Sequence, residues 1–136
     1  MINDRMFRAY STSHNEIAFG FLSKTAESWY LERETRLYEV DINSLGMNTG
    51  KKDCQRNMIY GSVEVNGVMS RGGDIVTLRD LVDDSFRKQE FVVEYSNTRF
   101  RFVLDNEVNK KGYPLSMPDT SVTIIGNQFQ GRKESL

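Results

Sequence analysis

Alternating apolar and polar residues predict strands along much of the chain. Segments 6–11 and 16–22 are short apolar runs on either side of the polar residues 12–15, which predicts a strand, a turn and a second strand or buried segment. Apolar residues at every second position in 38–42 favour another strand. A last strand is expected within 120–129.

Two β-hairpins are predicted from their turn residues. Asn66-Gly67 is the residue pair preferred in a type I′ turn, and a valine stands on either side of it. Segment 90–104 alternates between apolar and polar residues on both sides of Ser96-Asn97-Thr98. These three residues are expected to connect the second hairpin.

Two segments carry helical signals instead. The first half of 23–42 contains several acceptable helix formers. Segment 77–90 places apolar residues at helical spacing behind Thr77, which can cap a helix. The polar segments 43–57 and 105–119 are expected to be loops.

The length and the order of these elements indicate one domain over residues 1–136, which is close to the commonest domain size. Five or six strands with one or two helices predict an α+β fold that is mostly antiparallel β, built as a sheet or a small barrel. The polar tail 130–136 is expected to fray.

Charge and composition exclude several classes of protein. Lys and Arg number 18 and Asp and Glu 19, so the chain, with a net charge of −1, lacks the basic field of a general nucleic-acid binder, although a local basic face stays open. No apolar run approaches the roughly 20 residues that span a bilayer, and the N-terminus shows no secretory signal. A single cysteine excludes an intrachain disulfide and fits a reducing cytoplasm.

Reactive side chains are too few for most metal and catalytic sites. His14 is the only histidine and Cys54 the only cysteine, whereas zinc sites need about three or four ligands. His14 lies in a segment expected to be a solvated turn, and Cys54 is interpreted as an incidental loop thiol. We therefore expect no metal, no cofactor and no enzyme activity.

The glycine pair in SRGGDIVTL (70–78) matches neither a phosphate-binding loop nor a dinucleotide fingerprint. We expect Gly72 and Gly73 to supply a positive-φ turn. Asp74 would cap that turn before the following apolar residues enter the core. Arg71 would then be exposed to a ligand.

The remaining candidate for a binding site is arginine next to aromatic residues. Arg99 and Arg101 share one face of their predicted strand, and residues 7–10 (FRAY) offer a similar mixture. Arginine binds phosphates bidentately and aromatic rings stack on bases. The alternative is a solvated strand face, with Phe100 and Phe102 pointing inward, which alternation alone predicts.

Several segments, taken in order, resemble the YopX-like family of phage and prophage proteins. The matching segments are MFRAYS, with Tyr10 where the family usually has Trp; Thr49, Gly50, Lys52 and Asp53; Ile59-Tyr60; Gly73-Asp74-Ile75-Val76; the hairpin VVEYSNTRFRF; and Ile124, Ile125, Gly126 and Asn127. The interval between Tyr60 and Gly73 is longer than in the family, and residues 23–48 match none of its motifs.

The resemblance implies a small, mostly β, SH3-like or barrel-containing fold that is oligomeric and acts in the cytoplasm of a bacterial host. It transfers no catalytic residues. The first hypothesis is a non-enzymatic phage protein that binds a small anionic, nucleotide-like ligand, in the sharpest form a sponge for a cyclic nucleotide signal of host immunity. The expected ligand contacts are Arg8, Tyr10, Arg71, Arg99, Phe100, Arg101 and Asn127.

Two other functions stay open. One is a module that binds nucleic acid or a host protein and redirects transcription or replication, since small barrels with basic loops bind single strands. The other is a structural or assembly role carried by oligomerisation alone.

Overall fold

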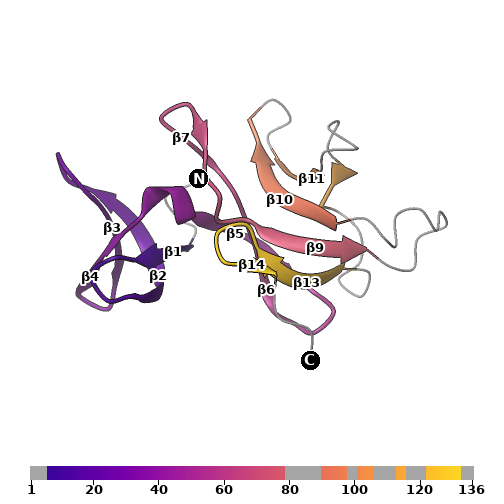
Figure 1. Ribbon diagram of the computed structural model, residues 1–136, viewed down its shortest axis with the longest axis horizontal. Coiled ribbons are helices and arrows are strands. Elements are labelled where there is room, and N and C mark those ends of the chain that lie inside the picture. Colours follow the sequence, from indigo (N-terminus) through magenta and orange to yellow (C-terminus); the bar gives the residue numbers. More distant parts are fainter. Residues whose placement is uncertain (1–5, 79–89, 98–100, 106–112, 116–121, 133–136) are drawn as a thin grey trace.

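The protein folds almost entirely into antiparallel β-structure (Figure 1). The computed structural model describes residues 6–78, 90–97, 101–105, 113–115 and 122–132. The described strands form two six-stranded sheets and one two-stranded hairpin. Figure 1 shows β1–β4 at one end of the long axis, and β9, β10 and β13 toward the other.

The first sheet comes from the N-terminal half of the chain, in the order β2-β3-β4-β1-β5-β6. Its strands are β1 (Phe7–Ser11), β2 (Glu16–Lys24), β3 (Trp29–Arg33), β4 (Arg36–Val40), β5 (Gly46–Lys52) and β6 (Met58–Gly61), with a 3₁₀ turn at Ile42–Ser44. β1 also pairs along its whole length with β2. In its pairing with β4, Ser11 and Val40 are the only partners in register. One residue pair does not close a barrel, so the expected small barrel is absent from the described strands.

The second sheet has the order β12-β11-β10-β9-β13-β14. Its strands are β9 (Asp74–Leu78), β10 (Glu90–Ser96), β11 (Arg101–Asp105), β12 (Tyr113–Pro114), β13 (Val122–Asn127) and β14 (Gly131–Arg132). β14 lies in the segment expected to fray and pairs with β13. The separate hairpin consists of β7 (Glu64–Val65) and β8 (Val68–Met69).

Ser62, directly after β6, joins the two sheets. Its N–H donates to the carbonyl oxygen of Val93 and its own carbonyl oxygen accepts from the N–H of Tyr95, both at 2.8 Å. Both partners belong to β10. The end of the first sheet is therefore hydrogen-bonded to the second.

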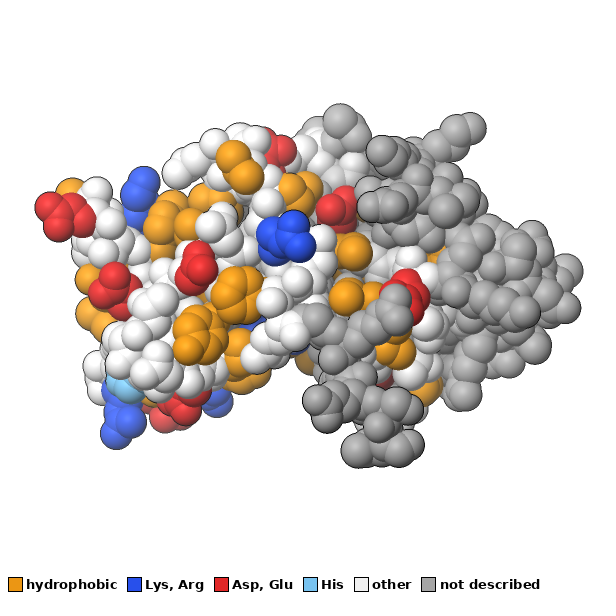
Figure 2. All heavy atoms as spheres, in the orientation of Figure 1, with side chains coloured by type: hydrophobic (Ala, Val, Ile, Leu, Met, Phe, Trp, Pro, Cys, Tyr) orange, Lys and Arg blue, Asp and Glu red, His pale blue; other side chains and the backbone are white. Residues whose placement is uncertain are grey.

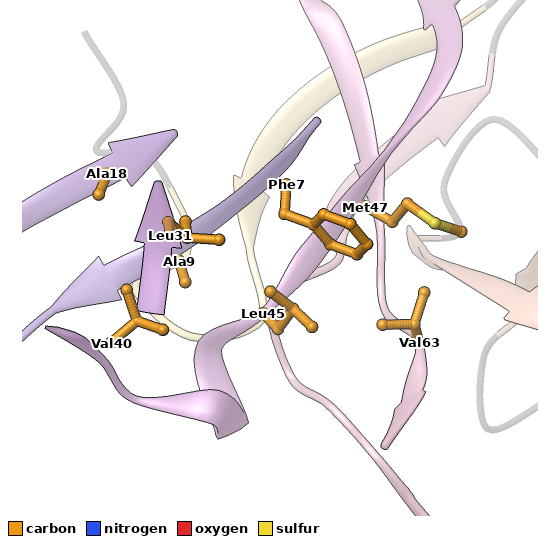
Figure 3. Close-up of a cluster of buried hydrophobic side chains, with 8 residues drawn as sticks. All are labelled: Phe7, Ala9, Ala18, Leu31, Val40, Leu45, Met47 and Val63. Carbon is orange, nitrogen blue, oxygen red and sulfur yellow. The ribbon is translucent and has the colours of Figure 1, made fainter. Parts of the chain in front are cut away.

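The buried apolar side chains form two clusters, and strands of both sheets contribute to the second. The first contains Phe7, Ala9, Ala18, Leu31, Val40, Leu45, Met47 and Val63; the second contains Ile59, Val76, Leu78, Phe91, Val93, Leu104, Leu115 and Val122. Phe102 packs against both clusters. At the surface, Figure 2 shows apolar side chains interspersed with charged ones, whereas Figure 3 shows Phe7 lying beside Met47 inside the first cluster.

Most of the predicted strands are confirmed. Segments 6–11 and 120–129 contain β1 and β13, segment 16–22 lies within β2, and residues 38–40 belong to β4. Asn66 and Gly67 have φ values of 52° and 82°, as a type I′ turn requires. The strand pair of the second hairpin is also confirmed, as β10 and β11. Ser96, expected in the connection, is instead the last residue of β10, and residues 98–100 lie outside the described residues.

The expected helices are not found in the described chain, and the α+β prediction is wrong there. In 23–42, the N–H of Thr25 donates to the carbonyl of Ser28 at 3.0 Å, which turns β2 into β3. Leu31 in β3 is fully buried in the first cluster, so packing overrides helix propensity. The ends of the second expected helix belong to β9 and β10, and residues 79–89 lie outside the described residues.

The predicted loop 43–57 contains strand β5, so this prediction is also corrected. The glycines of this segment interrupt the alternation of apolar and polar residues from which a strand is predicted. A Cβ on Gly46 would lie 2.6 Å from the carbonyl oxygen of Gly72, and Gly50 has a φ of 82° where the β5–β6 register shifts. Glycine here allows close approach and a bulge rather than a loop.

Gly72 and Gly73 do not have positive φ, contrary to expectation. They are glycines because other backbone approaches too closely for a side chain. A Cβ on Gly73 would overlap the carbonyl oxygen of Val93 and lie 2.6 Å from Ser62 Oγ. A Cβ on Gly72 would overlap the backbone of Ser44 and Leu45.

Candidate ligand-binding site

A pocket of about 460 Å³ lies between β1, β2 and β6 of one sheet and β9 and β13 of the other. Its walls are Arg8, Ile17, Phe19, Asn57, Met58, Asp74, Ile124, Gly126, Asn127 and Gln130. Pockets for small molecules typically measure about 300–1,000 Å³ and combine an apolar lining with a few polar groups. This pocket has both properties.

Strand geometry places one wall of the pocket. Ile17 and Phe19 are two residues apart on β2 and so face the same side of the sheet. Arg8 stands directly opposite Phe19 in the pairing of β1 with β2, which brings it to that same face. One strand pair therefore supplies a cation and two apolar side chains.

Arg8 is held by a buried ion pair with Asp74. Its Nη2 lies 2.8 Å from Asp74 Oδ1 and donates at 2.8 Å to the carbonyl of Gly72. The two side chains are 15% and 2% exposed. Asp74 Oδ2 accepts the backbone N–H of Tyr60 at 2.8 Å. The carboxylate thus connects β1, β6 and β9.

Tyr60 lies under the Arg8 guanidinium. Arg8 Cζ is 4.4 Å from the centroid of the Tyr60 ring, a cation–π geometry, and the Phe19 ring centroid is 6.0 Å away. Burial raises the pKa of the Tyr60 hydroxyl above 10.0; the Arg8 charge opposes that shift and the Asp74 charge adds to it. The tyrosine is therefore neutral at physiological pH.

Asp53 fixes the opposite wall. Its Oδ1 accepts the N–H groups of Gln55 and Asn57 at 3.0 and 2.8 Å, and its Oδ2 accepts the N–H of Ile124 at 3.2 Å. Asp53 is 1% exposed, so this carboxylate is satisfied by backbone donors inside the protein. It holds the β5–β6 loop against β13, which positions Asn57 and Ile124 at the pocket.

Two amide side chains complete the lining at the end of β13: Asn127 is its last residue and Gln130 follows it. Asn127 Nδ2 donates to Gln130 Oε1 at 2.9 Å, and the N–H of Gln130 donates to Asn127 Oδ1 at 2.7 Å. These bonds shape the turn into β14. Amide groups carry both donors and acceptors, so this wall can bind a polar edge of a ligand.

Only part of the predicted contact set meets at the pocket. Arg8 and Asn127 line it. Tyr10 shares the Arg8 face of β1; its ring lies 5.9 Å from Phe129, and its hydroxyl donates to Asn15 Oδ1 at 3.3 Å.

The other predicted contacts lie elsewhere. Arg71 is exposed between β8 and β9 and is not among the lining residues. Arg99 and Phe100 lie outside the described residues, as does the side chain of Arg101 in β11.

Sequence reasoning missed several lining residues and the partners of Asp74. Asp74 was expected to cap a turn, but its side chain bonds Arg8 and the N–H of Tyr60. A lone carboxylate at the start of an apolar strand was the available signal, because a buried charge needs a partner. Phe19 and Gln130 gave no local signal, because only the packing of the two sheets brings them together.

Other candidate chemistry is sparse in the described residues. They contain no group of three His, Cys, Asp or Glu side chains that could hold a metal ion. His14 is exposed, with Nδ1 2.8 Å from Ser13 Oγ and its ring 4.6 Å from that of Tyr38. The same residues include no helix with the length and apolar character needed to cross a membrane.

Comparison with known proteins gives no relative: no family model, curated protein or solved structure matches this chain.

Proposed function

We propose that this protein is a non-catalytic binding protein that holds a small nucleotide-like ligand in the pocket between its two sheets. The observation that carries the proposal is the composition of the pocket. An arginine and three amide side chains stand beside the apolar side chains of Ile17, Phe19, Met58 and Ile124. The sugar and the base edges of such a ligand need polar partners, and the faces of its bases need an apolar or aromatic surface.

The segments that resemble the YopX-like family support a shared site. They are far apart in the sequence, yet Arg8, Asp74, Gly126 and Asn127 line one pocket. Asp53, from a further segment, holds one wall through the N–H of Ile124. A common role in binding accounts for this convergence.

The sharpest form of the proposal is a phage-encoded sponge that sequesters a cyclic nucleotide signal of host immunity in the host cytoplasm. The resemblance to phage proteins motivates this form. Calorimetry against cyclic dinucleotides, cyclic trinucleotides and cyclic ADP-ribose isomers tests it. We expect a saturable heat of binding with at least one of these ligands at micromolar protein. If none of them gives a heat of binding, the sponge hypothesis is wrong.

A matched pair of glutamine variants tests the pocket itself. Gln130→Ala removes a lining amide, whereas Gln55→Ala removes an exposed amide that does not line the pocket. We expect Gln130→Ala to weaken binding about 5-fold or more, since a lost hydrogen bond is worth about 1 kcal/mol. Equal affinities of the two variants would place the ligand elsewhere.

We also propose that the protein forms a homo-oligomer, as the resemblance to the YopX-like family implies. Light scattering would measure its mass in solution against the single-chain value of 15.7 kDa. A single-chain mass would remove the oligomer and leave the pocket in place, because the lining residues named above all come from one chain.

Nucleic-acid binding has less support. On the face in Figure 2, the described Lys and Arg side chains form separate spots instead of a continuous basic patch. Retention on single-stranded DNA that falls steeply with salt would favour this alternative, because phosphate contacts release counterions.

A further inference from the structure

The formal charges of the pocket cancel. Arg8 and Asp74 are the only charged residues among its described walls, and they are paired at 2.8 Å. A phosphate that approached the guanidinium would also approach the Asp74 carboxylate. Attraction to one charge is therefore offset by repulsion from the other.

Arg8 is also restrained by its other contacts. The nitrogen that bonds Asp74 bonds the carbonyl of Gly72 as well, and the guanidinium lies over the ring of Tyr60. Turning Arg8 toward a phosphate would separate it from Asp74, whose side chain is 2% exposed. Leaving such a buried charge without its partner is strongly unfavourable.

The rest of the lining suits a flat, uncharged ring. Phe19 offers an aromatic surface, and Ile17, Met58 and Ile124 offer apolar ones. The polar groups are amides, which match the adjacent donors and acceptors on base edges. The side-chain amide of Asn57 makes no hydrogen bond within the described part of the chain, so it is available to such an edge.

We infer that the pocket recognises the nucleobase of its ligand and leaves the phosphates outside. This inference rests on the proposed function and specifies which part of the ligand is bound. It predicts that removing the phosphates costs little affinity, and that salt has little effect on binding, because few counterions are released.

Titrations with the four ribonucleosides, their 5′-monophosphates and inorganic pyrophosphate test the inference. We expect at least one nucleoside to bind within about tenfold of its monophosphate, and pyrophosphate not to compete. Binding of nucleotides without any binding of nucleosides would overturn the inference and keep the proposed function. Failure of all of these probes together with the cyclic nucleotides would overturn both.

Two phenylalanine variants on β2 locate the base. Phe19→Leu keeps an apolar side chain in the pocket but removes the ring, and we expect nucleoside affinity to fall about 5- to 150-fold, the measured range for stacking on one base. Phe21→Leu makes the same change two residues along, at a side chain that is 50% exposed and does not line the pocket. Equal affinity of the two variants would contradict stacking on Phe19.

Discussion

The carboxylate of Asp74 joins three strands, because each of its oxygens is hydrogen-bonded to a different strand. One oxygen pairs with Arg8 on β1 and the other accepts the N–H of Tyr60 on β6, while Asp74 itself begins β9. A carboxylate buried in this way depends on its partners, because an unpaired charge inside a protein is costly.

Asp74→Asn keeps the size of the side chain and an acceptor for Tyr60 but removes the charge that pairs with Arg8. We expect the free energy of unfolding to fall by about 3–5 kcal/mol, the usual loss when one partner of a buried pair is removed. Urea denaturation measures this, with the exposed Glu32→Gln as the control. A loss below about 1 kcal/mol, typical of surface pairs, would contradict the buried role.

Ionisation of Tyr60 makes the free energy of unfolding depend on pH in the alkaline range. Its pKa is raised in the folded protein above the ordinary value of 10.0, chiefly by burial. Near and above that value the folded state binds more protons than the unfolded state, so stability is full below about pH 10 and falls as the pH rises through the folded pKa.

Urea denaturation between about pH 8 and 12, spanning the ordinary tyrosine pKa, compares the wild type with Tyr60→Phe. The variant cannot ionise at this position, so we expect its stability to fall less steeply with pH than that of the wild type. Other tyrosines and lysines titrate equally in both proteins. Parallel curves for the two would show that Tyr60 carries no such dependence.

At the scale of elements, the residue before β9 lies so close to β10 and to the residue after β6 that glycine is required. A side chain on Gly73 would meet Ser62, which follows β6, and the carbonyl of Val93 on β10. The N–H of Ser62 and the carbonyl of Val93 are also hydrogen-bonded to each other, which joins the two sheets. The close approach of strands, and not a left-handed turn, explains this glycine.

Gly73→Ala tests the close approach. We expect it to lower the free energy of unfolding by about 1–3 kcal/mol or more, as overpacking does, because backbone must move to admit the methyl group. Arg71→Ala, two residues earlier and exposed, should leave stability unchanged. Thermal denaturation of both variants measures the two effects. Equal midpoints of the Gly73→Ala and Arg71→Ala variants would exclude a tight contact at Gly73.

Local patterns predicted some elements well and others badly. Alternation found β1, β2 and β13, and turn chemistry found the hairpin at Asn66-Gly67. Helix propensity gave the wrong prediction at β3. Its residues pair with β2 and β4 because Leu31 is buried in the core. Intrinsic helix propensities differ by less than about 1 kcal/mol per residue, which burial of one leucine exceeds.

At the scale of the whole molecule, Phe102 couples the two apolar clusters. It packs against both and meets the Tyr95 ring edge-on at a centroid distance of 5.3 Å. A Cβ on Gly61 would lie 2.7 Å from the ring of Phe102, so the end of β6 is also fitted to it.

Phe102→Ala should weaken the coupling between the clusters. We expect a loss of about 3 kcal/mol, the lower end for Phe→Ala because this side chain is half-buried. Trp29, the only tryptophan, reports on the first sheet, so its fluorescence can be compared with circular dichroism of the whole protein.

The two signals should change together in the wild type and separate in Phe102→Ala. Phe21→Ala, at an exposed phenylalanine, should keep them together. Coincident transitions with an unchanged midpoint in Phe102→Ala would mean that the clusters are joined by other contacts.

The sequence by itself determined the features that depend on neighbouring residues. These are the alternation that makes most strands, the type I′ turn, and the presence of arginine beside aromatic residues on β1. The tertiary structure alone decided that Arg8 meets Asp74, 66 residues away, and that Phe19, Asn127 and Gln130 line one pocket. Such contacts follow from the register and packing of whole sheets, and no short segment carries that information.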